Sequence, residues 1–334
     1  MIRTIALHFF TSALCLYAPA AALAVTIPTV PVGNPGNANN SNGYGGVAKN
    51  YRIGTTEVTN AQYAAFLNLK AASDPLTLYN ANMGSNASGG ITRSGSSGSY
   101  TYAAKTNMAD KPVNYVSWYD SIRFANWLNN GQGAGDTESG AYTLLGGTPA
   151  PSNGLSITRN VGATWFLTSE NEWYKSAYHQ PAAQGGDADN YWRYPTKSNS
   201  APTIATANAV GDISNPGTNV ANYNRGADWN SLDGNVTTVG SAGPLSESFY
   251  GTSDQGGNVM EWNEALIDGA FRGFRGGSCI DSLFIMSSSP RYSLDPTRDD
   301  VTTGFRVATV PEPGTFCLAA FAGLALLAIR RRRG

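Results

Sequence analysis

The sequence is poor in charge and in histidine, and each shortage excludes a class of function. Only 13% of the residues are charged and the formal net charge is −1 at pH 7, so no basic field is present to attract nucleic acid. We therefore expect no nucleic-acid partner. Histidine occurs only as His8 and His179. A metal site built from several histidines is thus largely excluded, as is a catalytic triad with histidines to spare.

Cysteine is equally scarce, with three residues at Cys15, Cys279 and Cys317. Cys15 and Cys317 lie in terminal segments that have the patterns of processing signals. Cys279 is therefore alone in the middle of the chain, where it has no partner for an intrachain disulfide. We expect the stability of this part to come from core burial and from bound metal.

Residues 1–24 have the pattern of a secretory signal peptide. One positive charge, Arg3, precedes a mostly apolar run at 5–16, and Ala22 and Ala24 form a small-x-small cleavage site. We expect a signal peptidase to remove this segment. A transmembrane or core helix is the alternative interpretation.

Residues 310–334 contain a second signal pattern. Pro311-Glu312-Pro313 is followed by an apolar stretch at 316–329 and by an arginine cluster at 330–333. A helix over the apolar stretch would be about 21 Å long, shorter than a ~30 Å hydrocarbon core. In this order, the three features resemble the PEP-CTERM sorting signal of Gram-negative bacteria.

The resemblance implies a precursor that is held at the inner membrane through its tail until an exosortase removes the tail. A simple tail anchor, with the arginines kept in the cytoplasm, is the alternative. Both interpretations export the middle of the chain, to the periplasm, the cell surface or the extracellular matrix.

The middle of the chain divides into a polar leader and one domain. Residues 25–47 are rich in Pro, Gly, Asn and Ser, which predicts a flexible leader or an irregular first loop. The folded domain is expected at 48–309. Within it, residues 180–257 are nearly all Asn, Asp, Gly, Pro and Thr with scattered aromatics, which leaves disorder or metal-organised structure as the open alternatives.

Three segments of the domain combine an N-terminal capping box with apolar residues at helical spacing, which predicts helices. These helices are expected to begin after Thr59, Ser117 and Ser169. Short strands are expected at 51–54 and 165–167.

Six short motifs occur in order along residues 48–309. They are Glu57-Val58-Thr59-Asn60, Pro112-Val113-Asn114-Tyr115-Val116-Ser117-Trp118, Leu167-Thr168-Ser169-Glu170-Asn171-Glu172-Trp173, Gly257-Asn258-Val259-Met260-Glu261-Trp262, Arg275-Gly276-Gly277-Ser278 and Gly304-Phe305-Arg306-Val307. Together they resemble the formylglycine-generating enzyme, or sulfatase-modifying factor, domain. The resemblance implies a single α+β domain, a variant of the C-type-lectin-like fold with little regular secondary structure and often with bound calcium.

The catalytic cysteines of that family are missing. Members that oxidise a substrate cysteine to formylglycine use a Cys-x4-Cys pair shortly after Gly-Gly-Ser, and thiolates suit the role as nucleophiles and soft Cu(I) ligands. Counted without gaps, the two positions fall on Asp281 and Met286. Cys279 lies two residues too early, and a lone cysteine there fits a small core residue better than a nucleophile. We therefore expect no catalytic residues, no formylglycine generation and no bound copper.

Calcium is the cofactor that the resemblance implies, because its six to eight oxygen ligands can come from short Asp/Asn/Gly-rich segments. A first site would use the side chains of Asp254 and Glu261 with the carbonyl groups of Gly257 and Val259. The alternative is that these residues serve turn formation alone.

A second calcium site would use the side chains of Asn222 and Asp233, with carbonyl groups near Tyr223 and Asn235. The loop that would hold this second site is shorter here than in the family.

Two functions follow from these features. The first is a non-catalytic binding or structural module displayed at the cell surface. In lectin-like relatives the segment between Gly-Gly-Ser and Gly-Phe-Arg forms the ligand face, and here it mixes acidic, aromatic and basic groups that suit a polar ligand, an extracellular polysaccharide or a protein. The candidate ligand-binding residues are Asp281, Phe284, Arg291 and Tyr292. The alternative function is a formylglycine-generating oxidase, or a related redox enzyme, that acts on exported proteins.

Overall fold

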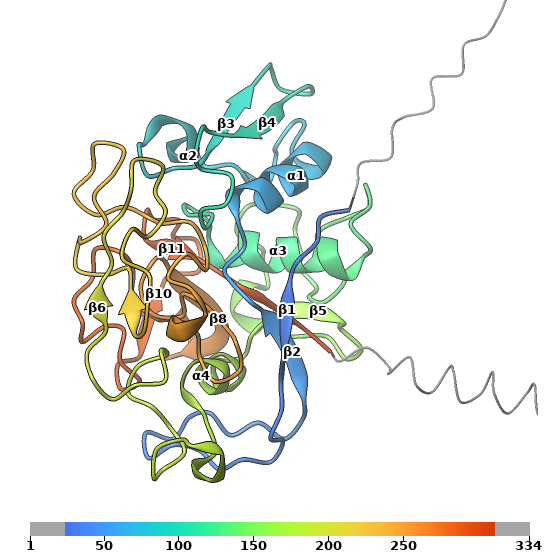
Figure 1. The fold of residues 1–334 in the computed structure, drawn as a ribbon. Coiled ribbons are helices and arrows are strands. Elements are labelled where there is room, and N and C mark those ends of the chain that lie inside the picture. Colours follow the sequence, from blue (N-terminus) through green and yellow to red (C-terminus); the bar gives the residue numbers. More distant parts are fainter. Residues whose placement is uncertain (1–23, 311–334) are drawn as a thin grey trace, which may run out of the picture.

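The computed structural model describes residues 24–310 (Figure 1). The segments expected to be a signal peptide and a sorting tail, at 1–24 and 310–334, lie outside this range except for their boundary residues. Within the range, three longer helices and two four-stranded sheets lie around one main core, and loops make up most of the remainder. The predicted α+β fold with little regular secondary structure is confirmed. None of the helices described is long and apolar enough to cross a membrane.

The first sheet joins the two ends of the domain. Its strands, in spatial order, are β1 (Thr29–Val32), β2 (Tyr51–Gly54), β12 (Val307–Thr309) and β5 (Trp165–Leu167), and each neighbouring pair is antiparallel. Strands from the beginning and the end of the domain therefore pair directly. Figure 1 shows β1 and β2 in blue, side by side in this sheet.

The position of β1 corrects the expectation for residues 25–47. This segment is predicted as a flexible leader or an irregular first loop, yet it supplies a strand whose Val30 pairs with Ile53. Pro31 is tolerated because β1 is an edge strand of the sheet. The strand is short and its partner lies outside the segment, so composition alone could not reveal it.

The second sheet carries the motifs of the last third of the chain. Its strands, in spatial order, are β10 (Tyr292–Leu294), β9 (Phe271–Arg275), β8 (Met260–Ile267) and β11 (Thr303–Gly304). β8 and β9 form an antiparallel hairpin with a register shift between Trp262 and Leu266, while β11 runs parallel to β8. Gly304 pairs with Glu261, which brings Glu261 next to the segment that leads into Arg306.

The three predicted helices are present, and each begins at the predicted capping box. They are α1 (Asn60–Lys70), α3 (Trp118–Asn129) and α4 (Glu170–Tyr178). In each, the N-cap hydroxyl accepts from the backbone N–H three residues later, and the side chain of that later residue accepts from the N-cap N–H. The start of each helix is thus fixed by local contacts that the sequence already contains.

The main core is aromatic. The ring centroid of Phe124 on α3 lies 5.4 Å from those of Phe66, Trp127 and Phe305. Phe66 belongs to α1 and Phe305 directly precedes Arg306, so these contacts hold the two helices against the last motif of the domain. Edge-to-face and tilted packing of this kind adds to the stabilisation from burial alone.

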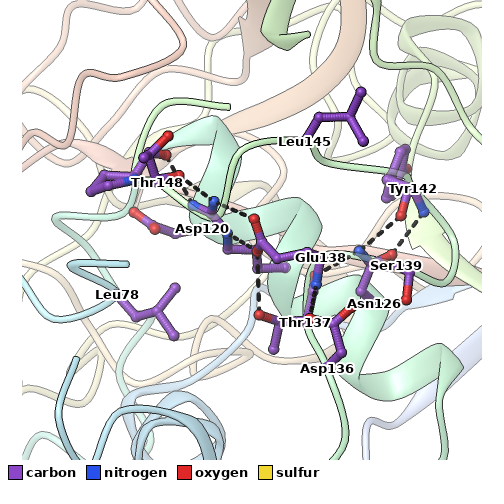
Figure 2. Close-up of polar contacts among 12 residues, drawn as sticks. Leu78, Asp120, Asn126, Asp136, Thr137, Glu138, Ser139, Tyr142, Leu145 and Thr148 are labelled. Carbon is purple, nitrogen blue, oxygen red and sulfur yellow. Dashed lines mark hydrogen bonds and ion pairs between the residues drawn. The ribbon is translucent and has the colours of Figure 1, made fainter. Parts of the chain in front are cut away.

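The segment after α3 is fastened to that helix by buried polar contacts (Figure 2). Arg123 donates from Nε to Glu138 Oε1 at 2.6 Å and from Nη2 to the carbonyl oxygen of Thr148 at 2.8 Å. Asn126 donates to the carbonyl oxygens of Thr137 and Tyr142 at 2.8 and 3.0 Å. A long loop with little regular structure is therefore held in place by side chains of one helix.

The polar segment 180–257 is likewise ordered by its own backbone and amides. Asn219 donates to Ser198 Oγ and to the carbonyl oxygens of Ser200 and Ala201. Asn219 has a φ of 55°, and several other asparagines of the segment also have positive φ angles. Asparagine tolerates this left-handed conformation better than most residues. Turn formation thus accounts for much of the asparagine content.

The remaining elements are short. They are α2 (Asn82–Ser85), β3 (Ile91–Ser94), β4 (Thr101–Ala104), η1 (Gly154–Ser156), η2 (Ala182–Gln184), β6 (Thr203–Ile204), β7 (Val220–Ala221) and η3 (Pro244–Ser246).

Candidate functional site

Two of the candidate ligand-binding residues have internal partners. Asp281 accepts hydrogen bonds from Ser278, from its backbone N–H at 2.8 Å and from its hydroxyl at 2.5 Å, which closes the turn after Gly-Gly-Ser. Arg291 pairs with Glu170, with 2.8 Å between Nη2 and Oε2. Both residues are therefore fixed in position, and a ligand would meet them as a preformed surface.

The two aromatic candidates differ in exposure. Tyr292 stacks on Phe274, with 5.9 Å between ring centroids. Phe284 is 58% exposed. Phe284 is thus the aromatic candidate with more surface free for a partner.

The environment of Cys279 is that of a core residue. Its side chain packs with Met108, Trp229 and Val259, and 7% of the residue is exposed. Burial, together with the nearby Asp281 carboxylate, raises the pKa of the Cys279 thiol to about 12. The thiolate that nucleophilic or metal chemistry requires is therefore scarcely populated at neutral pH.

Glu261, a candidate calcium ligand, lies in a fully buried ion pair. Arg306 donates from Nε to Glu261 Oε2 at 2.5 Å and from Nη2 to Oε1 at 2.7 Å. Trp173 Nε1 donates to the same Oε2 at 2.7 Å. Both carboxylate oxygens are thus hydrogen-bonded, which makes Glu261 a fixed part of the core.

Two further carboxylates lie near Arg306. Asp254 is partly buried, has a φ of 61° and accepts from the backbone N–H of Gly240 at 2.5 Å, and desolvation raises its pKa to about 6. Glu57 is 2% exposed, and neither of its carboxylate oxygens has a hydrogen-bond partner within residues 24–310. Burial raises the pKa of Glu57 well above its usual value, and the neighbouring Asp254 carboxylate raises it further.

We call Glu57, Asp254, Glu261 and Arg306 the Arg306 cluster. With all groups ionised it has three negative charges and one positive charge, an imbalance that is costly inside a protein unless protons or a cation compensate it. A cavity of about 10 Å³ borders Asp254, which is roughly the room that one water molecule needs. In residues 24–310 no three His, Cys, Asp or Glu side chains are grouped so that they could hold a metal, so a cation here would need amide or carbonyl oxygens as well.

Gly257 and Val259, the two candidate carbonyl ligands of the first expected calcium site, lie in tightly packed surroundings. Gly257 has a φ of 93°, and a Cβ atom there would collide with the carbonyl oxygen of Asn222. Val259 is buried against Cys279. Glycine at position 257 is therefore required for the close approach of this loop to Asn222.

The second expected calcium site is partly assembled. Asn222 is 2% exposed and donates from Nδ2 to the carbonyl oxygen of Asn235 at 2.9 Å. Asn222 Oδ1 and Asn235 Nδ2 are buried without partners in the described part of the chain. Tyr223 is also buried, whereas the side chain of Asp233 is 76% exposed and lies 4.0 Å from Arg225 Nη1. The structure therefore brings Asn222 and Asn235 together and leaves the Asp233 carboxylate at the surface.

Sequence reasoning gave no role to Glu57, Arg306 or Trp173. All three lie in the motifs that carry the family resemblance, within Glu-Val-Thr-Asn, Gly-Phe-Arg-Val and Asn-Glu-Trp. A charged residue between apolar neighbours, as in Gly-Phe-Arg-Val, is a signal for a buried ion pair, but it does not identify the partner.

An acidic cavity of about 210 Å³ lies beside the candidate ligand segment. It is lined in part by Thr77, Asp120, Thr297 and Asp299. Burial raises the pKa of Asp120 to about 7, although two hydrogen bonds from Ser117 oppose this shift. Asp120 therefore caps α3 and also lines the cavity.

The fold and these residues define a protein of the formylglycine-generating-enzyme type in which Cys279 is the single free cysteine of residues 24–310. A family model described as "Sulfatase-modifying factor enzyme 1-like domain" matches residues 34–310, and the chain belongs to this family. The model of the PEP-CTERM protein-sorting motif matches residues 309–333. Both predicted resemblances are thereby confirmed, and the chain is an exported protein with a signal for exosortase processing.

Solved structures are similar over most of the chain. CarF is similar over 86% of this chain and 99% of its own, with 22% identity and a TM-score of 0.53. Variable protein 1 of Treponema denticola is similar over 85% of this chain and 95% of its own, with 19% identity and a TM-score of 0.49. At 22% identity, the similarity to CarF supports the fold assignment alone. No curated protein sequence matches the chain.

Proposed function

We propose that the domain is a non-catalytic binding or structural module, stabilised by calcium and displayed at the cell surface after export. A signal peptidase and an exosortase would process the two ends of the chain. The ligand would be an extracellular polysaccharide or protein that meets the surface around Phe284, Arg291 and Tyr292. The C-type-lectin-like character that the family resemblance implies fits such a role.

The proposal that the domain is non-catalytic rests on one observation, the lack of a second cysteine near Cys279 in residues 24–310. Counted without gaps, the family's two cysteine positions fall on Asp281, which closes a turn with Ser278, and on Met286, which is fully buried. Cys279 is a poor replacement because burial raises its thiol pKa to about 12, and it is the single free cysteine in residues 24–310.

This part of the proposal is tested with a substrate peptide. The purified protein, loaded with Cu(I), is incubated with a Cys-x-Pro-x-Arg peptide, and aldehyde formation is followed by mass spectrometry. We expect no conversion by the protein or by its Cys279→Ser variant. Conversion that disappears in Cys279→Ser would establish the oxidase alternative instead.

Calcium binding is supported by the charge of the Arg306 cluster. A divalent cation near Asp254 would offset the two excess negative charges, and Asp254 could share it with Glu261 and with the carbonyl oxygens of Gly257 and Val259. The second proposed site rests on the unpartnered Asn222 oxygen next to Asn235. It would add the Tyr223 carbonyl and, after a rearrangement of its loop, Asp233.

The calcium proposal is tested by thermal unfolding of the purified protein with chelator and with added calcium. We expect the melting temperature to fall with chelator and to recover with Ca²⁺ more than with Mg²⁺, because calcium accepts irregular oxygen ligands more readily. Unchanged melting in all conditions would remove calcium from the proposal and leave protonation to balance the cluster.

A further inference from the structure

A polar cavity lies between the loop after β1 and the loops after α4. Figure 1 shows these blue and yellow-green loops next to each other. The cavity has a volume of about 340 Å³, within the range of small-molecule sites. Its polar lining includes Asn34, Asn37, His179, Asp189, Asn190 and Tyr191.

The walls are held in place by contacts behind them. Lys175 is fully buried and donates to the carbonyl oxygen of Asn34 at 2.7 Å. Tyr191 donates to the carbonyl oxygen of Ala38 and accepts from Asn37 Nδ2, each at 2.7 Å. These bonds join the loop after β1 to α4 and to the segment that follows it, so the cavity is formed without a ligand.

His179 offers a hydrogen-bond donor to this cavity. Asn34 Nδ2 donates to the Tyr250 hydroxyl at 3.1 Å, and that hydroxyl lies 2.7 Å from His179 Nδ1. We assign the hydroxyl proton to the contact with Nδ1, because the hydroxyl has no other acceptor among residues 24–310, and this assignment places the ring proton of neutral His179 on Nε2. His179 is 3% exposed, and its ring makes no further hydrogen bond to the described residues. The Nε2–H group is therefore an unpartnered donor at the cavity wall.

The ring is neutral at physiological pH. Burial lowers the pKa of His179 to about 4, and the charge of Lys175 adds to this shift. His179 can therefore hydrogen-bond a ligand but gives it no ionic attraction.

Asp189 supplies the opposite polarity. Its Oδ1 accepts from the backbone N–H of Tyr191 at 2.9 Å, and its Oδ2 has one long contact of 3.3 Å with Asn40 Nδ2. Carboxylate oxygens can accept more bonds than these, so Oδ2 keeps capacity for a donor from a ligand.

The combination of these groups selects a class of ligand. The Asp189 carboxylate would repel an anion. The Nε2–H of His179 presents the positive end of its dipole and would repel a cation. A hydroxyl group both accepts and donates, so a ligand with several hydroxyls can bond to both His179 and Asp189. The side-chain amides of the asparagines in the wall can serve either role as well.

We propose that this cavity binds a neutral polyhydroxylated ligand, a mono- or disaccharide unit, through the Nε2–H of His179 and the carboxylate of Asp189. The site is separate from the Phe284 surface. It depends neither on calcium nor on the absence of catalysis, so it stands or falls independently of the function proposed above.

The proposal is tested by ligand-observed NMR and calorimetry on the purified full-length protein. The probes are D-glucose, D-galactose, D-mannose and N-acetyl-D-glucosamine with their β-1,4-linked dimers, and inorganic phosphate and putrescine serve as charged comparisons. We expect at least one sugar to bind more tightly than either charged probe. In ¹⁵N spectra, that sugar should shift His179 Nε2 more than Nδ1.

Two variants are compared with a matched control. Asp189→Asn should weaken sugar binding by about tenfold or more, because it removes a charge-assisted hydrogen bond. Asp187→Asn, a change at a nearby carboxylate that does not line the cavity, should bind as the parent does. His179→Phe should also abolish the sugar signal. If this variant fails to fold, the Asp189→Asn comparison and the ¹⁵N shifts of the parent still test the proposal.

Three outcomes would overturn the proposal. They are no binding by any sugar, tighter binding of phosphate or putrescine than of every sugar, and sugar binding that is equal in Asp189→Asn and in the parent.

Discussion

Two charge clusters in the interior of this domain differ in how their charges are balanced. In the Arg306 cluster, one guanidinium faces the carboxylates of Glu57, Asp254 and Glu261. In a second cluster, which we call the Glu170 cluster, the single carboxylate of Glu170 accepts from Arg275 Nε at 2.8 Å and from Arg291 Nη2 at 2.8 Å. One cluster thus has excess negative charge and the other excess positive charge.

The excess charge is compensated differently in the two places. In the Glu170 cluster, the ring of Tyr44 lies 4.6 Å from the Arg275 guanidinium and 5.5 Å from that of Arg291, so an aromatic face takes up part of the charge. The Arg291 side chain is also 35% exposed to water. In the Arg306 cluster, Glu57 is buried with neither oxygen bonded to another described residue. Both guanidinium groups of the Glu170 cluster thus have a carboxylate partner, whereas the Arg306 cluster requires a proton or a cation.

The largest expected effect is that of Arg306→Met, which removes the one positive charge among three carboxylates. Loss of one partner from a buried ion pair typically costs about 3–5 kcal/mol, a large part of the stability of a domain. We expect urea unfolding to show a loss of this size, or no folded protein at all. Arg298→Met is the control, because that side chain is 62% exposed in its pair with Asp300 and its loss should change stability by less than about 1 kcal/mol. Equal losses in both variants would contradict the special status of the Arg306 cluster.

The second-largest expected effect on stability is that of Glu170→Gln, which we compare with Glu57→Gln. Glu170→Gln removes the carboxylate that two guanidinium groups share, and we expect a loss of about 2–3 kcal/mol. Glu57→Gln replaces an unpartnered carboxyl by a neutral isostere, and in chelator it should leave stability unchanged or raise it. Because burial raises the Glu57 pKa, the gain should grow as pH rises. Thermal unfolding across pH 5–9 measures both, and a loss in Glu57→Gln as large as that in Glu170→Gln would make the two clusters equivalent.

The third effect concerns Asp254 and pH. The folded-state pKa of Asp254 is raised from 3.8 to about 6, so the stability linked to its protonation is present below pH 3.8 and is lost as pH rises through about 6. Asp254→Asn removes this loss and keeps an oxygen for the N–H of Gly240. In chelator at pH 8 we expect the variant to be more stable than the parent by on the order of 1–2 kcal/mol. The gain is limited to this size because Asp254 is partly exposed and water screens its charge.

Added calcium should reverse the order of stability of the parent and Asp254→Asn. With excess Ca²⁺ at pH 8, the parent should regain stability, and Asp254→Asn should gain less because it has lost a charged ligand. Urea unfolding at pH 5 and pH 8, with chelator and with calcium, gives the values needed. Identical pH dependence of stability in parent and variant would show that Asp254 stays ionised without a bound cation. The charge of the Arg306 cluster would then no longer support a calcium site.

Local signals in the sequence predicted the helices well, and long-range pairing explains what they missed. The capping boxes at Thr59, Ser117 and Ser169 directly precede the helices that they start, so they could be recognised from the sequence. β1 is short and contains a proline, and it is a strand only because β2 lies beside it. No pattern inside residues 25–47 contains that information.

The contacts that the candidate site residues make could not be predicted from the sequence. The family resemblance made Glu261 a candidate calcium ligand, but the sequence could not show that Arg306 and Trp173 already bond its carboxylate. The family resemblance assigned Asp233 to the second calcium site, and the structure places its side chain at the surface. The cavity at His179 and Asp189 was invisible because one wall comes from the segment that was expected to be a leader.

The smallest expected effect is that of Arg291→Met at the rim of the Glu170 cluster. Arg291 is partly exposed, and Arg275 remains to neutralise Glu170, so we expect a change of no more than about 1 kcal/mol in urea unfolding. If the segment around Phe284, Arg291 and Tyr292 is a ligand face, the same substitution should weaken binding to an array of extracellular polysaccharides while stability stays constant. A loss of stability close to that of Arg306→Met would instead mean that Arg291 is structural, and the contrast between a self-sufficient cluster and one that needs a cation would fail.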